Sequence, residues 1–347
     1  MRPAIVLVVG VLVALFAPGV AQAHGVTTVA SGLDNPRGLA FAADGSLYVA
    51  EAGKGGAGPC FPGPNGGPVC WGTSGAITKI GHGGQKRVVT GLSSIANPDG
   101  SQAMGPSDVS VQGHDVLYTV GFGAAPAARA ALPDGGANAG WLLKLGRRKV
   151  ADIAGYEATA DPDKRGPETN PNSVVATPWG SAVADAAGNT LVWVGRNGTV
   201  STVAVLPELT VGGAPVHAVP TSVVIGPDGA FYVSQLTGFP FPPGQANIFR
   251  VVPGHAPTVY ASGLTNVIDL AFDRHGSLYA LEVSHAGLAS GDLTGALIKV
   301  RRDGSQQVVM STGLFGPGGL AIRGGAAYVS NCGVCPAGGT ILRIPLP

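Results

Sequence analysis

Charged residues are scarce in this chain. Asp, Glu, Lys and Arg together make up 12% of its 347 residues, and the formal net charge is +1. A nearly neutral surface with few charges gives no electrostatic attraction for a phosphate backbone or for anionic lipid. The composition therefore argues against nucleic acid and against a charged membrane surface as partners.

The chain also lacks a long apolar run beyond its first residues. Arg2 is followed by apolar residues 4–16, then by Pro18 and the triplet Ala21-Gln22-Ala23. This pattern is typical of a cleaved secretory signal peptide, and the run is shorter than the roughly 20 residues that span a bilayer. We predict a signal peptide over residues 1–23 and a secreted, monomeric, extracytoplasmic chain over 24–347, without a membrane span.

Only four cysteines are present, at positions 60, 70, 332 and 335. In an exported chain they are expected to be oxidised. Cys60 and Cys70 bracket a loop rich in Gly and Pro, and Cys332-Gly-Val-Cys335 is a tight pair. Two local disulfides are the favoured interpretation, although a crossed pairing between the two ends of the chain remains open.

Common catalytic motifs are missing as well. The chain has no G-x-S-x-G elbow, no Walker loop and no H-E-x-x-H. Residues 53–58 fit G-x-G-x-x-G, but no helix pattern follows them, and a chain with 56 glycines produces such matches by chance. No dinucleotide cofactor is predicted.

A short string is repeated six times along the chain. Its copies alternate apolar and polar residues, which is the period-2 pattern of a strand with one polar side. Five of the six carry Lys or Arg at the fifth place. They read "GAITKI" (75–80), "GWLLKL" (140–145), "NTLVWV" (189–194), "ANIFRV" (246–251), "GALIKV" (295–300) and "GTILRI" (339–344).

Each copy sits in a unit of four predicted strands. In the first unit "GLAFAA", "SLYVAEA", "GAITKI" and "KRVVTGL" are separated by turn signals such as Asp44-Gly45, because Gly accepts positive φ. The sixth unit ends at Pro347 without a fourth strand, whereas "VTTVASGL" (26–33) resembles the fourth strands of other units. Pairing it into the last unit would close a ring and remove the open sheet edges.

The sequence thus predicts an all-β protein, a six-bladed β-propeller with four-stranded antiparallel blades, whose ring is closed by an N-terminal strand in the last blade. The approximate blades are 34–92, 93–157, 158–209, 210–264, 265–314, and 315–347 together with 26–33.

The stretches "SGLDNPRGLAFAADGSLYVAEAG" and "FGPGGLAIRGGAAYVSN" resemble the ScyD/ScyE family of exported bacterial propellers. Their blade motifs are shared with the wider NHL and SMP-30/gluconolactonase propellers. The resemblance covers nearly all of the mature chain and implies the same fold.

Long insertions fall on one face of the predicted disc, at the connections from second to third strands and between blades. Binding residues favour loops displayed by a rigid scaffold, so this loop face is the candidate binding face, with an apolar tip at residues 239–243. Polar side chains cluster at the adjoining strand ends: Arg37, Glu51, Asp108, Asn172, Asp185, Gln235, Asp269, Glu282 and Asn331.

Two interpretations of these polar residues stay open. They could tie loops down by accepting backbone N–H bonds, or some could converge on the central channel and bind calcium or another divalent cation. Resemblance to SMP-30 propellers implies Glu51, Asp108, Asn172 and Asp269 as metal ligands. Glu51, however, lies at the end of a second strand rather than at the start of a first one.

Two functions follow. The first is a secreted, non-catalytic binding or scaffold protein for a small molecule or an extracytoplasmic protein. The alternative is an enzyme similar to the metal-dependent SMP-30/gluconolactonase hydrolases or to quinone-dependent sugar dehydrogenases, although no matched acid/base pair is visible.

Overall fold

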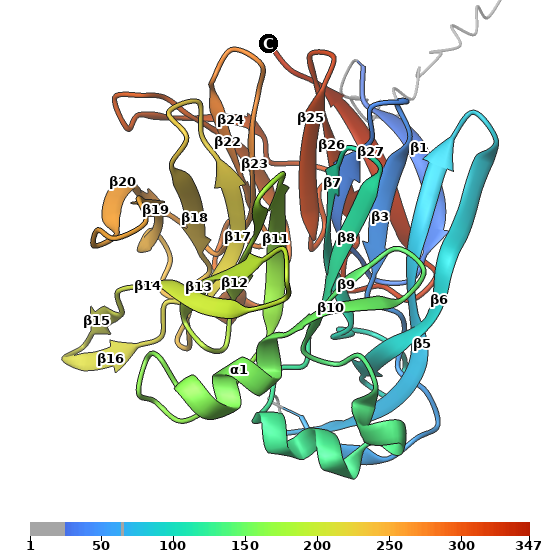
Figure 1. Ribbon diagram of the computed structural model, residues 1–347. Helices are drawn as coiled ribbons and strands as arrows, with labels where there is room; N and C mark the ends of the chain where they lie inside the picture. Colours follow the sequence, from blue (N-terminus) through green and yellow to red (C-terminus); the bar gives the residue numbers. More distant parts are fainter. Residues whose placement is uncertain (1–24, 64–65) are drawn as a thin grey trace, which may run out of the picture.

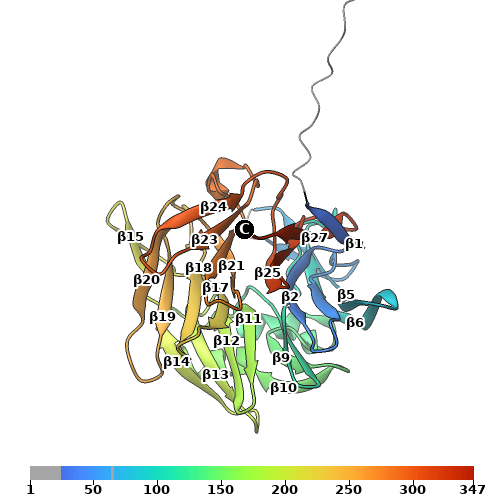
Figure 2. The same ribbon diagram turned by 90° about the horizontal axis from the view of Figure 1, so that it is seen from above.

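The computed structural model of the protein describes residues 25–63 and 66–347. Within them the chain forms a six-bladed β-propeller, with the blades arranged around a central axis (Figures 1 and 2). This confirms the predicted fold class. The predicted signal peptide, residues 1–23, and His24 lie outside the described residues.

Each blade is an antiparallel sheet of four main strands that runs from an inner strand at the axis to an outer one. From inside to outside, blade 1 consists of β2 (Pro36–Phe41), β3 (Leu47–Glu51), β5 (Pro68–Gly81) and β6 (Gly84–Ala96). Blade 2 consists, in the same order, of β7 (Pro106–Gln112), β8 (Asp115–Val120), β9 (Trp141–Lys144) and β10 (Arg148–Asp152). Blade 3 consists of β11 (Pro171–Thr177), β12 (Gly180–Asp185), β13 (Thr190–Gly195) and β14 (Val200–Val205). Blade 4 consists of β17 (Pro220–Ile225), β18 (Phe231–Gln235), β19 (Ala246–Val251) and β20 (Thr258–Leu264). Blade 5 consists of β21 (Val267–Phe272), β22 (Leu278–Glu282), β23 (Ala296–Val300) and β24 (Gln306–Met310). Blade 6 consists of β25 (Gly319–Arg323), β26 (Ala326–Asn331), β27 (Gly339–Pro345) and β1 (Thr27–Leu33).

The ring closes as predicted, because β1 is the outer strand of the last blade. It pairs antiparallel with β27, so that Thr27 lies opposite Arg343 and Leu33 opposite Gly339. Ala30 and Leu33 of β1 are buried in the core, whereas most of its other residues are exposed. The N-terminal strand therefore supplies both hydrogen bonds and apolar contacts to the C-terminal blade. Figure 2 shows β1 beside β27.

The core consists of apolar layers between neighbouring blades. Ile248 of blade 4, for example, packs in one cluster with Leu270 and Ile298 of blade 5. The predicted Asp-Gly turns connect the strands: Gly45 has φ +86°, and the Asp44 carboxylate accepts a hydrogen bond from the Ser46 N–H at 2.9 Å. Because these turns are tight, the connections between strands on this face of the disc are short.

Additional elements gather on the opposite face, at the bottom of Figure 1, which is the loop face. They are β4 (Cys60–Pro62), the hairpin of β15 (Leu209–Val211) and β16 (Ala214–Val216), the helix α1 (Ile153–Ala160), and 3-10 turns at Pro126–Ala131, Pro133–Gly136 and Leu288–Ser290. The sequence predicted long loops here but neither the helix nor the hairpin. No helix in the described part of the chain is long and apolar enough to cross a membrane.

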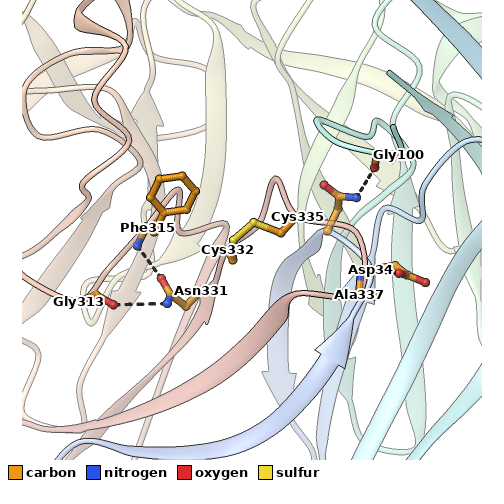
Figure 3. Close-up of a disulfide and its surroundings, with 9 residues drawn as sticks. Asp34, Gly100, Gly313, Phe315, Asn331, Cys332, Cys335 and Ala337 are labelled. Carbon is orange, nitrogen blue, oxygen red and sulfur yellow. Dashed lines mark hydrogen bonds between the residues drawn. A yellow bond between two sulfur atoms is a disulfide. The ribbon is translucent and has the colours of Figure 1, made fainter. Parts of the chain in front are cut away.

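Both predicted disulfides are present, and the described chain contains no free cysteine. Cys60–Cys70 joins β4 to β5, whereas Cys332–Cys335 closes the turn that follows β26 (Figure 3). Beyond that turn, the Ala337 N–H donates to the Asp34 carboxylate at 2.8 Å. The second disulfide therefore stands next to a contact between blade 6 and the start of blade 1.

Candidate functional site

A ring of six residues encircles the central channel, at the third position of five inner strands and at the first position of β25. Five of the inner strands have a register irregularity near their start, and such bulges re-aim side chains. We call these residues the channel ring; they are Gly38, Asp108, Ser173, Ser222, Asp269 and Gly319.

Hydrogen bonds link the channel ring from blade to blade. Asp108 of blade 2 accepts from the Ser173 hydroxyl at 2.8 Å and from the Val174 N–H at 2.9 Å. Ser173 in turn accepts from the Val223 N–H of blade 4 at 3.1 Å. Each of these residues thus satisfies a backbone donor of the next blade, which fixes the blades relative to one another.

The other half of the channel ring follows the same pattern. Ser222 donates to Asp269 at 2.6 Å, and Asp269 accepts from the Leu320 N–H of blade 6, also at 2.6 Å. The ring is completed by two glycines because space is short there. A Cβ on Gly38 would lie 2.0 Å from Oδ1 of Asp108.

Asp108 and Asp269 line one cavity of about 150 Å³ on the axis. Burial raises the pKa of Asp108 to about 8, with a further contribution from the nearby Asp269, and burial also raises the pKa of Asp269 to about 6. Ligand pockets usually measure about 300–1,000 Å³. The cavity therefore suits a proton, waters or a small cation better than a metabolite.

Two other predicted residues lie close to the ring without lining that cavity. Arg37 donates from Nη2 to the Ala103 carbonyl at 2.8 Å, and burial lowers its pKa to about 10. Asn172 donates from Nδ2 to the Thr221 carbonyl at 2.6 Å. Both side chains reach toward the following blade and hold its backbone.

Glu51 is buried at the end of β3 and is fully engaged by protein groups. Its carboxylate accepts from Arg87 Nε at 2.9 Å and from Arg87 Nη2 at 2.6 Å. It also accepts from the Asp34 N–H at 2.7 Å and from the Thr78 hydroxyl. Because Arg87 belongs to the outer strand β6, this network lies within blade 1 rather than in the channel.

The equivalent residues of other blades also hold backbone. Asp185 accepts from the Asn170 N–H at 2.6 Å, Glu282 from the Thr265 N–H at 2.7 Å, and Asn331 from the Phe315 N–H at 2.7 Å (Figure 3). Burial raises the pKa of Asp185 and of Glu282, which also contacts His285. In three blades, therefore, the last residue of the second strand accepts a backbone hydrogen bond from the segment that leads into the same blade.

Gln235 departs from that pattern in blade 4. Its Oε1 accepts from the Asn247 N–H at 3.1 Å and from Asn247 Nδ2 at 3.0 Å, and both belong to β19. Its Nε2 is buried without a partner in the described structure. Gln235 thus fastens neighbouring strands of one blade.

The four residues expected as metal ligands do not fit one ion together. Asp108 and Asp269 share the channel cavity, but Glu51 and Asn172 do not line it. The Arg87 guanidinium already neutralises Glu51, and a cationic neighbour opposes binding of a second cation. The ligand set that the SMP-30 resemblance implies is therefore not assembled here.

The structure reveals one acidic cluster that the sequence analysis missed. Carboxylate oxygens of Glu157, Asp161 and Asp163 lie within 4.8 Å of one another at the end of α1. Burial raises the pKa of Glu157 to about 8, and Asp185, Asp163 and Asp161 add to the shift. The spacing, Glu then Asp four and six residues later across a helix end, was the signal available in the sequence.

The surface of the loop face carries an exposed aromatic tip. Phe239, between β18 and β19, is 79% exposed and meets Phe241 edge-on with ring centroids 6.1 Å apart. On the opposite face, which carries the short turns and which we call the turn face, Trp179 lies between β11 and β12 and is 75% exposed. That face also has a groove of about 480 Å³ between blades 2 and 3, lined by polar and basic residues such as Lys144, Arg148 and Arg196.

No protein-family model matches the chain, and no curated protein matches it. Solved structures do. A Bacteroides thetaiotaomicron protein of unknown function aligns with 92% of this chain and 75% of its own (TM-score 0.57, 9% identity). A candidate gluconolactonase aligns over 92% and 91% (0.52, 11%), and a luciferin-regenerating enzyme over 92% and 94% (0.52, 8%). At these identities the likeness concerns the fold alone: this chain is a six-bladed β-propeller with gluconolactonase-like proteins among its structural neighbours.

Proposed function

We propose that the protein is an exported, monomeric binding or scaffold propeller, similar to the ScyD/ScyE group, that carries out no catalysis. Its loop face takes a small molecule or an extracytoplasmic protein. The observation that carries this proposal is the exposed aromatic tip of Phe239 and Phe241 on that face. Aromatic side chains on loops held by a rigid scaffold are typical contact residues.

The carboxylates near the loop face support a binding role over a catalytic one. General acid/base catalysis needs a carboxyl group within reach of a substrate proton. Glu51 is held by Arg87 and Asp34, and Asp185 by backbone donors. The carboxylates of Glu51 and Asp185 therefore hold loop segments in place through hydrogen bonds, and this gives the loop face a fixed shape.

Export is supported by two features of the chain. The first 23 residues have the pattern of a signal peptide, and both cysteine pairs are joined as disulfides. Disulfides persist in oxidising compartments outside the cytoplasm. Intact mass of the secreted protein tests cleavage after Ala23.

Site-specific photo-crosslinking tests the binding face. A benzophenone amino acid replaces Phe239 on the loop face or, as matched control, Trp179 on the turn face, since both positions are highly exposed. The proposal expects one saturable crosslinked product in the native exported fraction from position 239 and none from 179. Equal labelling from both positions, or labelling from 179 alone, contradicts the loop face.

The channel favours a second candidate, an enzyme of the SMP-30 hydrolase or quinone-dependent dehydrogenase type. Asp108 and Asp269 have pKa values raised to about 8 and about 6, and paired carboxyl groups with separated pKa values can serve as acid and base. The small cavity argues against it. Lactone or sugar turnover that Asp108→Asn abolishes would replace the binding proposal with this one.

A further inference from the structure

The cluster of Glu157, Asp161 and Asp163 does not line the channel cavity. Glu157 is in the last turn of α1, Asp161 caps the helix in a left-handed conformation with φ +38°, and Asp163 follows two residues later. Their carboxylate oxygens lie within 4.8 Å of one another. Three carboxylates at this spacing repel one another when they are ionised, unless a positive charge lies between them.

The protein itself supplies little such charge: the nearby Lys164 only partly offsets the upward shift in the pKa of Glu157. Among the described residues, none of the three carboxylates forms an ion pair. Lys164 donates instead to the Ala160 carbonyl at 2.9 Å, and Arg165 pairs with Glu208. Asp163 receives only neutral donors, Asn189 Nδ2 at 2.7 Å and the Arg165 N–H at 2.9 Å.

A second observation points to a ligand. Glu157 is 1% exposed, and its Oε1 has no hydrogen-bond partner in the described structure. The Asp161 Oδ1 is also buried and without a partner. Buried polar atoms in native proteins are nearly always satisfied, and an unpaired carboxylate is costly to bury.

We propose that Glu157, Asp161 and Asp163 bind one divalent cation, and that calcium is the ion that fits best. All three ligands are carboxylate oxygens, which are hard donors that calcium prefers, and backbone oxygens or waters can complete its six to eight ligands. The cation would sit at the C-terminal end of α1, where the helix dipole favours positive charge.

Such an ion would fasten α1 to blade 3. Asn189, which donates to Asp163, also contacts His217 and accepts from the Val219 N–H before blade 4. Gly188 faces Glu157 closely, since a Cβ there would lie 3.0 Å from Oε2. The ion would thus order the segment between blades 2 and 3 on the loop face.

Calorimetric titration of calcium into the EDTA-treated, full-length mature protein tests the proposal. We expect one calcium per chain with a dissociation constant of about 10⁻⁴–10⁻³ M, as in extracellular modules. Glu157→Gln and Asp163→Asn should each weaken binding at least about tenfold. Asp134→Asn, an exposed acid on the same face, and Asp108→Asn in the channel should bind like the wild type.

A second measurement uses the wild type alone, so it tests the site even if a variant fails to fold. In the wild type, calcium should slow amide hydrogen exchange in peptides that contain residues 153–166 and 185–189, and leave β21–β24 unchanged. No heat up to about 10 mM calcium, no such protection, or loss of binding in Asp108→Asn alone would overturn the site.

Discussion

At the scale of single residues, the two channel aspartates make stability depend on pH. Their native pKa values, about 8 for Asp108 and about 6 for Asp269, lie above the value of about 3.9 for an unfolded chain. Between these pH values the folded state holds protons that the unfolded state has lost. Their stabilising contribution is therefore complete below about pH 4 and is lost as pH rises through 6 and then 8.

We therefore expect the wild type, in EDTA, to lose unfolding free energy between pH 5 and pH 8 as these groups ionise in the folded state. Urea unfolding measures it. Asp108→Asn should show a smaller loss over the same interval, because one titrating group is gone. Glu157, whose pKa is also raised to about 8, contributes with the same sign in both proteins. An identical pH slope for variant and wild type would contradict the role of Asp108.

The Glu51–Arg87 pair gives a second prediction. Glu51 is completely buried, and Arg87 donates two hydrogen bonds to it. Arg87→Met leaves the carboxylate uncompensated, and because the Arg87 side chain is 42% exposed we expect a loss of roughly 1–3 kcal/mol, below the usual cost for a fully buried pair.

The surface pair of Arg250 and Asp228 is the control, where Arg250→Met should cost less than about 1 kcal/mol. Adding Glu51→Gln to Arg87→Met should recover part of the loss. Equal costs for Arg87→Met and Arg250→Met would show that Glu51 does not depend on Arg87.

Residue partners of this kind could not be predicted from the sequence. Asp44-Gly45 turns and strand-end carboxylates are visible locally, and the loop-tying interpretation describes the contacts of Asp185, Glu282 and Asn331. Arg87 lies 36 residues from Glu51, and only the pairing of β3, β5 and β6 brings the two together. On the inner strands, the direction of a side chain such as Asp108 depends on the bulge near the start of its strand.

At the scale of elements, the repeated strings predicted the strands because each blade repeats one pattern of alternation and turns. The helix α1 was not predicted. It has only eight residues, and isolated helices of that length are marginal without tertiary support. Its support comes from Asp152, which caps it by accepting from the Gly155 N–H and is held by Arg129. That contact spans 23 residues and has no local pattern.

The two disulfides should differ in their effect on stability. Cys60 and Cys70 are 10 residues apart, whereas Cys332 and Cys335 are three apart. A longer closed loop restricts the unfolded chain more, so Cys60→Ser with Cys70→Ser should cost roughly 2–3 kcal/mol, about 1 kcal/mol more than Cys332→Ser with Cys335→Ser. Urea unfolding of the two double variants makes the comparison, and the reverse order would contradict it.

At the scale of the whole molecule, ring closure joins the two ends of the described chain. Gly25 lies against Pro345, since a Cβ on Gly25 would be 2.9 Å from the Pro345 ring. Without β1 the last blade would lose its outer strand, and the edge of β27 would be exposed. The core residues that pack against Leu33 would also become exposed to solvent. An exposed strand edge pairs with other chains and promotes aggregation.

Deletion of residues 25–33 should therefore leave a protein that aggregates or melts far below the parent. A circular permutant separates the loss of the strand from the loss of its connection: it starts at Asp34 and carries residues 25–33 after Pro347 through a short Gly/Ser linker. Because β1 runs antiparallel to β27 and begins beside its end, the linker needs only a hairpin turn. The permutant should regain most of the parent's melting temperature and its monomeric elution in size-exclusion chromatography. A deletion variant that melts like the parent, or a permutant as unstable as the deletion, would show that β1 is not what closes the ring.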